Sequence, residues 1–196
     1  MRDPDIILRN MKILLHICCA PCSIYPLKVM REEGHDVVGL FFNPNIHPYS
    51  EYKKRLDTTI QYADTVGLKL IFSDEYPMED FLRGVVFREE TRCRYCYHTR
   101  LAYAAKVAKK GKFDGFTTTL LYSKFQDSTM LETLGKSVAQ ESGVPFYHRN
   151  FSQGWKEGID ASKNLGMYRQ QYCGCIYSEK ERFYRKQKKK SRQDIC

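Results

Sequence analysis

The sequence predicts an α/β fold in which a mostly parallel sheet of five strands lies between layers of helices. Short apolar runs alternate with longer segments of helical spacing from residue 12 to residue 148. Gly34, Gly67, Gly111 and Gly143 mark the ends of helical segments. Because strands that alternate with helices pair in parallel through right-handed crossovers, we expect a three-layer sandwich.

We expect five strands, at residues 12–17, 36–42, 68–72, 115–120 and 144–148. We expect helices between and after them, at residues 22–33, 50–66, 77–87, 96–110 and 127–141. Residues 91–96 either lie between the third and fourth of these helices or open the fourth. Ser50, and either Asp127 or Ser128, can cap the helices that they begin. From about residue 152 the chain has helical spacing, which is interrupted around Cys173-Gly174-Cys175. No long linker divides the chain, so we predict a single catalytic domain over residues 1–196 with a helical C-terminal part.

The composition favours a core that needs no disulfides. Hydrophobic residues make up 42% of the 196 residues. The first ten residues contain Asp3, Pro4 and Asp5 and lack the apolar stretch of a secretory signal. No segment approaches the roughly 18 apolar residues of a membrane span. We therefore expect a cytoplasmic protein with no membrane partner, in which the eight cysteines serve chemistry.

The net charge of +9 is concentrated late in the sequence. Lys180 to Arg192 holds eight Lys and Arg residues and one Glu, so the rest of the chain is nearly neutral. Such a run can lie along RNA phosphates and release their counterions. The alternative is a solvated end, because Lys-rich ends are common. We predict that residues 176–196 form a basic C-terminal helix or tail.

Three thiols, Cys18, Cys19 and Cys22, follow directly after the first predicted strand. Ligands bind at the carboxyl ends of parallel strands, where the strand order reverses. With the order 3-2-1-4-5, this point lies between the first and fourth strands, and the thiols face the loop at residues 121–127. The sequence therefore predicts metal ligands where another protein would hold a nucleotide.

Two CxxC pairs, Cys19/Cys22 and Cys93/Cys96, together offer the four sulfurs of a structural zinc site or an iron–sulfur cluster. Spacing alone does not choose between these metals, although the chain holds more thiols than zinc requires, which favours the cluster. A third interpretation is a thioredoxin-like dithiol at Cys19 and Cys22. That chemistry does not use the adjacent Cys18.

Cys173 and Cys175 form a different motif, because one intervening glycine allows a close and strained pairing of their sulfurs. A redox-active pair is one interpretation of this spacing. The alternatives are that one or both thiols bind metal, or that they are idle. Cys196 is expected to be inert.

Five segments of the sequence resemble one family, the QueH-type epoxyqueuosine reductases. They are Leu15-His-Ile-Cys-Cys-Ala-Pro-Cys22, Phe42-Asn-Pro-Asn-Ile-His-Pro48, Thr91-Arg-Cys-Arg-Tyr-Cys96, Thr117-Thr-Thr-Leu120 and Tyr168-Arg-Gln-Gln-Tyr-Cys-Gly-Cys175. The resemblance extends from Met11 to about Tyr184. It implies a Rossmann-like domain of the nucleotide-hydrolase branch, in which cysteines replace the phosphate-binding loop.

The resemblance also implies the cofactors. Four cysteines would bind a 4Fe-4S cluster: Cys18, Cys19, Cys93 and Cys96. Cys173 and Cys175 would form the redox-active pair, and a second, mononuclear iron would lie beside the cluster. Because they are close in the predicted topology, we place Cys22 and Asp127 near this second iron.

The activity implied by the resemblance is removal of the epoxide oxygen of epoxyqueuosine at the wobble position of a tRNA anticodon. The reaction gives queuosine and water, and it needs two protons and two electrons from an unidentified donor. RNA loops are read by stacking and basic contacts. Candidate side chains for such contacts are Tyr95, Tyr97, Trp155, Tyr172, Arg92, Arg94, Arg100 and Arg169. The competing classes are a zinc-stabilised RNA-binding module without catalysis and a metal-free dithiol oxidoreductase.

Overall fold

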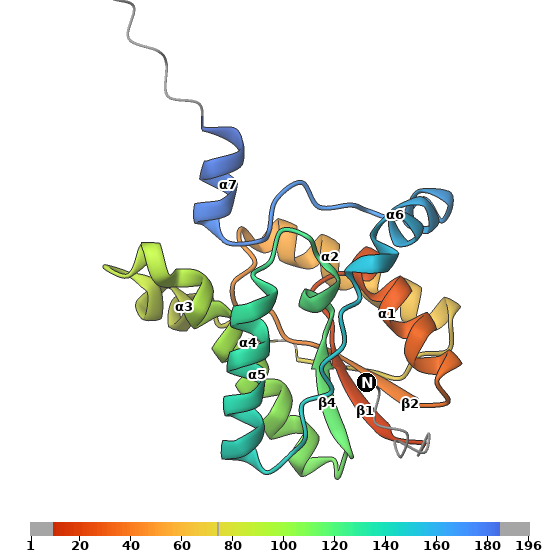
Figure 1. The fold of residues 1–196 in the computed structure, drawn as a ribbon. Helices are drawn as coiled ribbons and strands as arrows, with labels where there is room; N and C mark the ends of the chain where they lie inside the picture. The colour runs from red at the N-terminus through yellow and green to blue at the C-terminus, as the bar shows by residue number, and fades with distance from the viewer. Residues whose placement is uncertain (1–9, 74, 185–196) are drawn as a thin grey trace, which may run out of the picture.

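A computed structural model describes residues 10–73 and 75–184 and has the α/β fold that the sequence predicts (Figure 1). Its described residues form a four-stranded parallel sheet with the order β3-β2-β1-β4. The strands are β1 (Lys12–His16), β2 (Asp36–Phe41), β3 (Leu70–Phe72) and β4 (Gly115–Thr118). The first strand of the sequence is therefore an inner strand of the sheet.

Helices cover both faces of this sheet. The α-helices of the described residues are α1 (Ala20–Glu32), α2 (Tyr49–Thr65), α3 (Met78–Val85), α4 (Arg92–Lys110), α5 (Ser128–Ser142), α6 (Trp155–Asn164) and α7 (Ile176–Phe183). Short 3-10 helices are η1 (Glu89–Thr91), η2 (Thr119–Tyr122) and η3 (Ser152–Gly154). In Figure 1, α4 and α5 lie on one side of the sheet, and α1 and α6 lie on the other. No helix within residues 10–73 and 75–184 is both long and apolar enough to cross a membrane.

The predicted fifth strand, at residues 144–148, is reduced to a single parallel bridge between Phe116 and Phe146. Phe116 N donates to Pro145 O at 3.0 Å, and Tyr147 N donates to Phe116 O at 2.8 Å. Pro145 has no N–H with which to extend a ladder, and β4 ends at Thr118, where the chain turns into η2. The prediction of five strands is therefore wrong for the described residues, although the segment lies beside β4 as expected.

β1 carries the first thiols to one edge of the sheet. Residues 13–16 are completely buried, and β1 pairs in parallel with both β2 and β4. The chain leaves β1 through Ile17, whose N–H donates to Leu40 O at 2.8 Å. The strand order reverses between β1 and β4, as predicted, so Cys18 follows at the topological switch point.

Two helices begin with segments that carry cysteines. α1 begins at Ala20 rather than at residue 22, and α4 begins at Arg92, so the segment at residues 91–96 opens this helix, which is one of the two predicted alternatives. Cys22, Cys93 and Cys96 therefore all lie in or near the first turn of a helix. The N-terminus of a helix favours negative charge, so these positions suit thiolates.

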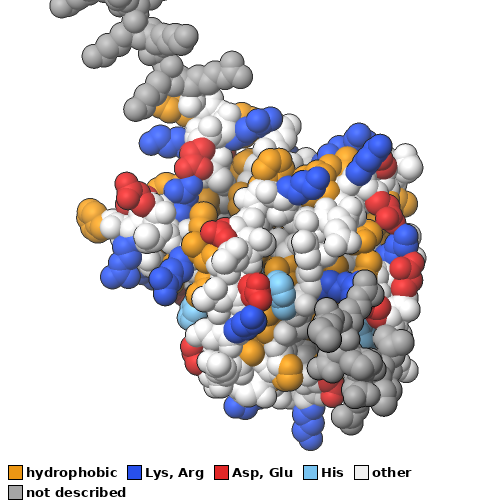
Figure 2. Space-filling model, viewed as in Figure 1, with side chains coloured by type: hydrophobic (Ala, Val, Ile, Leu, Met, Phe, Trp, Pro, Cys, Tyr) orange, Lys and Arg blue, Asp and Glu red, His pale blue; other side chains and the backbone are white. Residues whose placement is uncertain are grey.

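The described surface has mixed charge. Figure 2 shows Lys and Arg side chains interspersed with Asp and Glu on the face that it presents. This agrees with the nearly neutral body inferred from the sequence. The predicted basic tail begins in α7, and its residues 185–196 lie outside the described residues.

Gly135 allows α5 to lie close to the bridge of Phe116 and Phe146. A Cβ atom at position 135 would lie 2.3 Å from Cδ1 of Phe146. We expect Gly135→Ala to destabilise the protein by roughly 1–3 kcal/mol, the usual cost of overpacking, although alanine is the better helix former. Urea unfolding measures the change, with Gln140→Ala at an exposed position of α5 as the control. An alanine variant as stable as the unmodified protein would contradict this packing.

Candidate metal centre

Three buried sulfur atoms lie together at the junction of β1 and α1. The Sγ atoms of Cys18, Cys19 and Cys22 are all within 4.8 Å of one another, a group that can hold a metal ion. The Sγ atoms of Cys19 and Cys22 are 2.8 Å apart, and those of Cys18 and Cys19 are 3.8 Å apart. Cys22 joins the group because residues three apart share a face of a helix turn. We call these three residues the thiol triad.

The triad favours one thiolate. Hydrogen bonds from Cys19 and Cys22 lower the pKa of Cys18 well below its usual range, and the positive charge of Arg100 lowers it further. Burial raises the pKa of Cys19. Thr119, at the start of η2, donates its hydroxyl to Cys18 Sγ at 3.2 Å. A thiolate, rather than a thiol, is the form of cysteine that binds metal, so the triad is already arranged for ligation.

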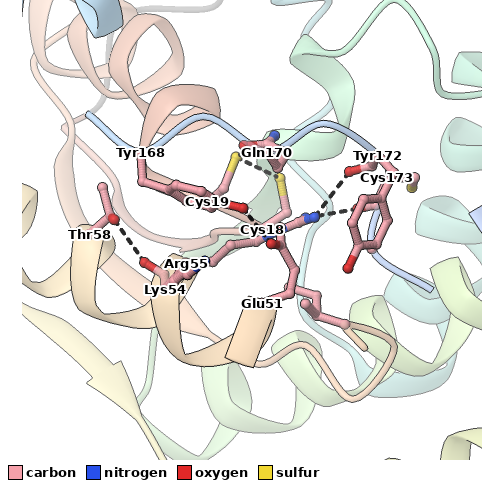
Figure 3. A network of polar contacts seen from close by, with 12 residues as sticks. Cys18, Cys19, Glu51, Lys54, Arg55, Thr58, Tyr168, Gln170, Tyr172 and Cys173 are labelled. Carbon is pink, nitrogen blue, oxygen red and sulfur yellow. Dashed lines mark hydrogen bonds and ion pairs between the residues drawn. The ribbon is translucent and has the colours of Figure 1, made fainter. Parts of the chain in front are cut away.

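Gln170 closes the triad from the C-terminal side. Its Nε2 donates to Cys19 Sγ at 3.0 Å and lies 3.5 Å from Cys22 Sγ. Gln170 belongs to the segment between α6 and α7, which therefore lies over the β1–α1 junction (Figure 3). Sequence reasoning did not single out Gln170, although it lies inside the motif that ends at Cys175.

The two cysteines of α4 are not part of this close group. Cys96 is buried and Cys93 is exposed. Burial raises the pKa of Cys96 to about 12, against an opposing effect of Arg100. Arg100 Nη1 donates to Cys96 Sγ at 3.6 Å, and the charge of Arg100 also acts on Cys18. Arg100 therefore connects α4 with the triad, while the structure groups Cys18 and Cys19 more closely with Cys22 than with Cys93.

Arg100 is buried, with 2% of its surface exposed. Its Nη2 donates to Asn43 Oδ1 at 2.8 Å, and its Nε lies 3.3 Å from His16 Nε2. Burial, and then the charge of Arg100, lower the pKa of His16 to about 3, so this imidazole is neutral. The sequence analysis named Arg100 as a candidate RNA contact. Because its side chain is buried, Arg100 cannot contact RNA.

A second buried arginine holds the C-terminal segment in place (Figure 3). Arg55 of α2 is 1% exposed, and its Nε donates to Glu51 Oε1 at 2.7 Å. Its Nη1 and Nη2 donate to the carbonyl oxygens of Cys173 and Tyr172 at 2.8 and 3.0 Å. Tyr168 donates its hydroxyl to the other oxygen of Glu51. No sequence signal marks Arg55 or Glu51, because charged residues on a helix usually face solvent.

Cys173 and Cys175 are free thiols, as are the other cysteines of the described residues. Gln126 Nε2 donates to Cys173 Sγ at 3.5 Å. Cys175 is the N-cap of α7, where its sulfur accepts from Ser178 N at 3.4 Å. The two sulfurs thus have separate partners, and their role as a redox pair remains a prediction.

Asp127 has a structural task in the described structure. Its Oδ1 accepts from Met130 N at 2.9 Å and caps α5, as one of the two predicted caps. The residue that reaches a thiol is its neighbour Gln126, which sequence reasoning did not identify. A position for Asp127 near a second iron remains a prediction.

Comparisons with known proteins agree with the resemblance found in the sequence. The family model described as "Epoxyqueuosine reductase QueH" matches residues 13–181. A protein of that name from Dehalococcoides mccartyi is 36% identical over 88% of this chain and 94% of its own length. Those from Thermotoga maritima and Histophilus somni are 35% and 33% identical, over 87% and 85% of this chain and 91% and 72% of their lengths. The chain, with its thiols at the β1–α1 junction and on α4, therefore belongs to the epoxyqueuosine reductase QueH family.

Proposed function

We propose that this protein reduces epoxyqueuosine in the anticodon of tRNA to queuosine, and that it uses an iron–sulfur cluster to do so. Family membership over residues 13–181 supports the reaction. The observation that carries the cofactor is the thiol triad, whose sulfurs lie within 4.8 Å of one another at the carboxyl edge of the sheet. The proposed cluster ligands are Cys18, Cys19, Cys93 and Cys96, with Cys22 beside a second iron.

The residues present suit such a centre. Sulfur is the only donor atom of the triad, and thiolates select zinc, Cu(I) and iron–sulfur clusters. Within the described residues, the buried Arg100 donates to Asn43, Cys96 and His16 and forms no ion pair with a carboxylate. Its sulfur contact is Cys96, and its charge acts also on Cys18. An uncompensated buried cation costs several kcal/mol, so the charge of Arg100 supports bound thiolates on both sides.

The reaction breaks both C–O bonds of the epoxide, forms a C=C bond and releases the oxygen as water. It therefore consumes two electrons and two protons. When bound, the cluster supplies electrons singly, and the second iron supplies a Lewis acid for oxygen. Oxidation of the thiols Cys173 and Cys175 to a disulfide releases two electrons and two protons, which is the amount required. An electron donor, not yet identified, would then reduce the disulfide again.

The decisive experiment is anaerobic purification followed by reaction with tRNA that carries epoxyqueuosine. We expect a brown protein that contains iron and sulfide and produces queuosine, detected by mass spectrometry of the released nucleosides. A colourless protein that contains only zinc and binds tRNA without changing it would favour the RNA-binding module. A colourless protein that reduces disulfides would favour the metal-free oxidoreductase.

Single substitutions distinguish two ligand sets for the cluster. If the proposed set is right, Cys18→Ala, Cys19→Ala, Cys93→Ala and Cys96→Ala each remove cluster iron and sulfide together with activity, whereas Cys22→Ala retains the cluster. If the triad itself holds the cluster, Cys22→Ala loses it and Cys93→Ala keeps it. Iron and sulfide analysis of the purified variants decides between these outcomes.

Replacing Arg100 with the uncharged Met should weaken the centre, because the buried positive charge beside Cys96 and Cys18 is lost. We expect the affinity for iron to fall roughly 10-fold to 100-fold, as for other groups that support metal ligands. Arg100→Lys, which keeps the charge, should retain more iron. Arg94→Met, at an exposed position of α4, is the control. Equal iron content in the Arg100→Met and Arg94→Met variants would show that the charge is not needed.

Replacing Cys173 or Cys175 with Ser should abolish turnover and leave iron and sulfide unchanged, because neither sulfur belongs to the proposed cluster ligands. Cys196→Ser serves as a matched control and should behave like the unmodified protein. Activity assays paired with visible absorption test this. Loss of cluster absorption in Cys173→Ser would instead make Cys173 a ligand.

A further inference from the structure

Phe125 presents a large apolar ring to solvent, with 84% of its surface exposed. It lies in the loop between η2 and α5. Its ring meets that of Trp155 edge to face, with centroids 5.6 Å apart and planes at 81°. Trp155 in turn lies 5.1 Å from the buried ring of Tyr122. The three rings form a row from the surface into the protein, which we call the aromatic row.

Both ends of the aromatic row adjoin the thiols. At the inner end, Tyr122 belongs to η2, whose first residue, Thr119, donates to Cys18 Sγ at 3.2 Å. The ring of Tyr122 also lies 6.5 Å from that of Tyr25, on the helix that carries Cys22. At the outer end, the residue next to Phe125 is Gln126, whose Nε2 donates to Cys173 Sγ at 3.5 Å. Phe125 therefore stands beside the place where the proposed reaction occurs.

The loop that carries Phe125 is held by its own hydrogen bonds. Phe125 N donates to Ser123 Oγ at 3.3 Å, and Gln126 N donates to Ser123 O at 3.2 Å. Asp127 closes the loop by capping α5. These bonds fix the backbone while the ring remains in water. A preorganised side chain of this kind loses little conformational freedom when a partner binds.

The neighbouring charges favour an RNA partner. Lys124 is exposed beside Phe125, and Arg169 is exposed beside Gln170, whose Nε2 donates to Cys19 Sγ at 3.0 Å. Figure 2 shows hydrophobic and basic side chains next to each other on the part of the surface below α7 and α6. Alternating apolar rings and cations are the combination with which proteins hold single-stranded nucleic acid.

We propose that Phe125 stacks on a nucleobase of the tRNA anticodon loop that neighbours the modified base, an inference that rests on the proposed function. Bases of RNA loops can be splayed apart, and each base offers a face for stacking, whatever the sequence. With one base held on Phe125, its neighbour is directed toward Gln126 and Cys173. The residue thus contributes affinity and position, while Lys124 and Arg169 are suited to phosphates.

The test measures binding of an anticodon stem-loop RNA that carries epoxyqueuosine, at several salt concentrations. We expect Phe125→Ala to raise Kd about 5-fold to 100-fold, the usual contribution of one stacked base, and Phe125→Trp to retain affinity. The salt dependence should stay unchanged, because stacking releases no phosphate counterions. Phe87→Ala is the control, since Phe87 is also an exposed phenylalanine, at 94%, but follows α3.

A second readout reports the contact itself. In RNA with 2-aminopurine next to the wobble position, stacking on Phe125 should quench the fluorescence, and Phe125→Ala should remove this quenching. Equal Kd values and quenching for the unmodified protein and Phe125→Ala would overturn the proposal, as would equal losses in Phe125→Ala and Phe87→Ala. Unchanged RNA binding with slower reduction by a protein electron donor would reassign the ring to that donor. If the protein binds this RNA through Phe125 but never converts it, the proposed function fails and the stacking site stands.

Discussion

Two buried guanidinium groups flank the thiols, and their charges are balanced in different ways. Arg55 forms an ion pair with Glu51 and donates to two carbonyl oxygens of the C-terminal segment. Arg100 instead contacts a sulfur, an amide oxygen and a neutral imidazole. A buried cation needs an anion or a full set of hydrogen bonds. The charge of Arg100 is therefore fully compensated only when nearby sulfurs are negatively charged. The same thiolates that would bind metal thus also balance the charge of the protein interior.

The centre is assembled from parts of the chain that are far apart in sequence. The β1–α1 junction supplies Cys18, η2 supplies the hydroxyl of Thr119, and α4 supplies Cys96 and Arg100. The segment after α6 supplies Gln170, which contacts Cys19 although the two residues are 151 positions apart in the sequence. The parallel sheet makes this possible, because it brings the carboxyl ends of β1, β2 and β4 to one edge.

Hydrophobic periodicity was sufficient to locate the four paired strands and the end of β1, which the thiols follow. The strand order was assumed from the fold class, and the four paired strands agree with it. The fifth strand does not form because Pro145 has no backbone N–H to donate to the sheet. The prediction of this strand rested on apolar content, which does not take the missing N–H into account. The burial of Arg55 and Arg100 depends on how α2 and α4 pack against segments that are distant in sequence. Their residue type alone therefore suggested that both lie on the surface. Gln170 lies in a recognisable motif, but its contact with Cys19 follows only from the folded position of that segment.

Cys175 caps α7 with the same sulfur that the proposed redox pairing with Cys173 would use. Its Sγ accepts the backbone N–H of Ser178 at 3.4 Å and so caps α7. A covalent bond that removes this acceptor would remove the contribution of the cap to α7, because linkage is reciprocal. α7 in turn carries Glu181, which pairs with Arg92 at the beginning of α4. Bond formation at the sulfur of Cys175 is thus thermodynamically coupled to the position of α7, the last described helix.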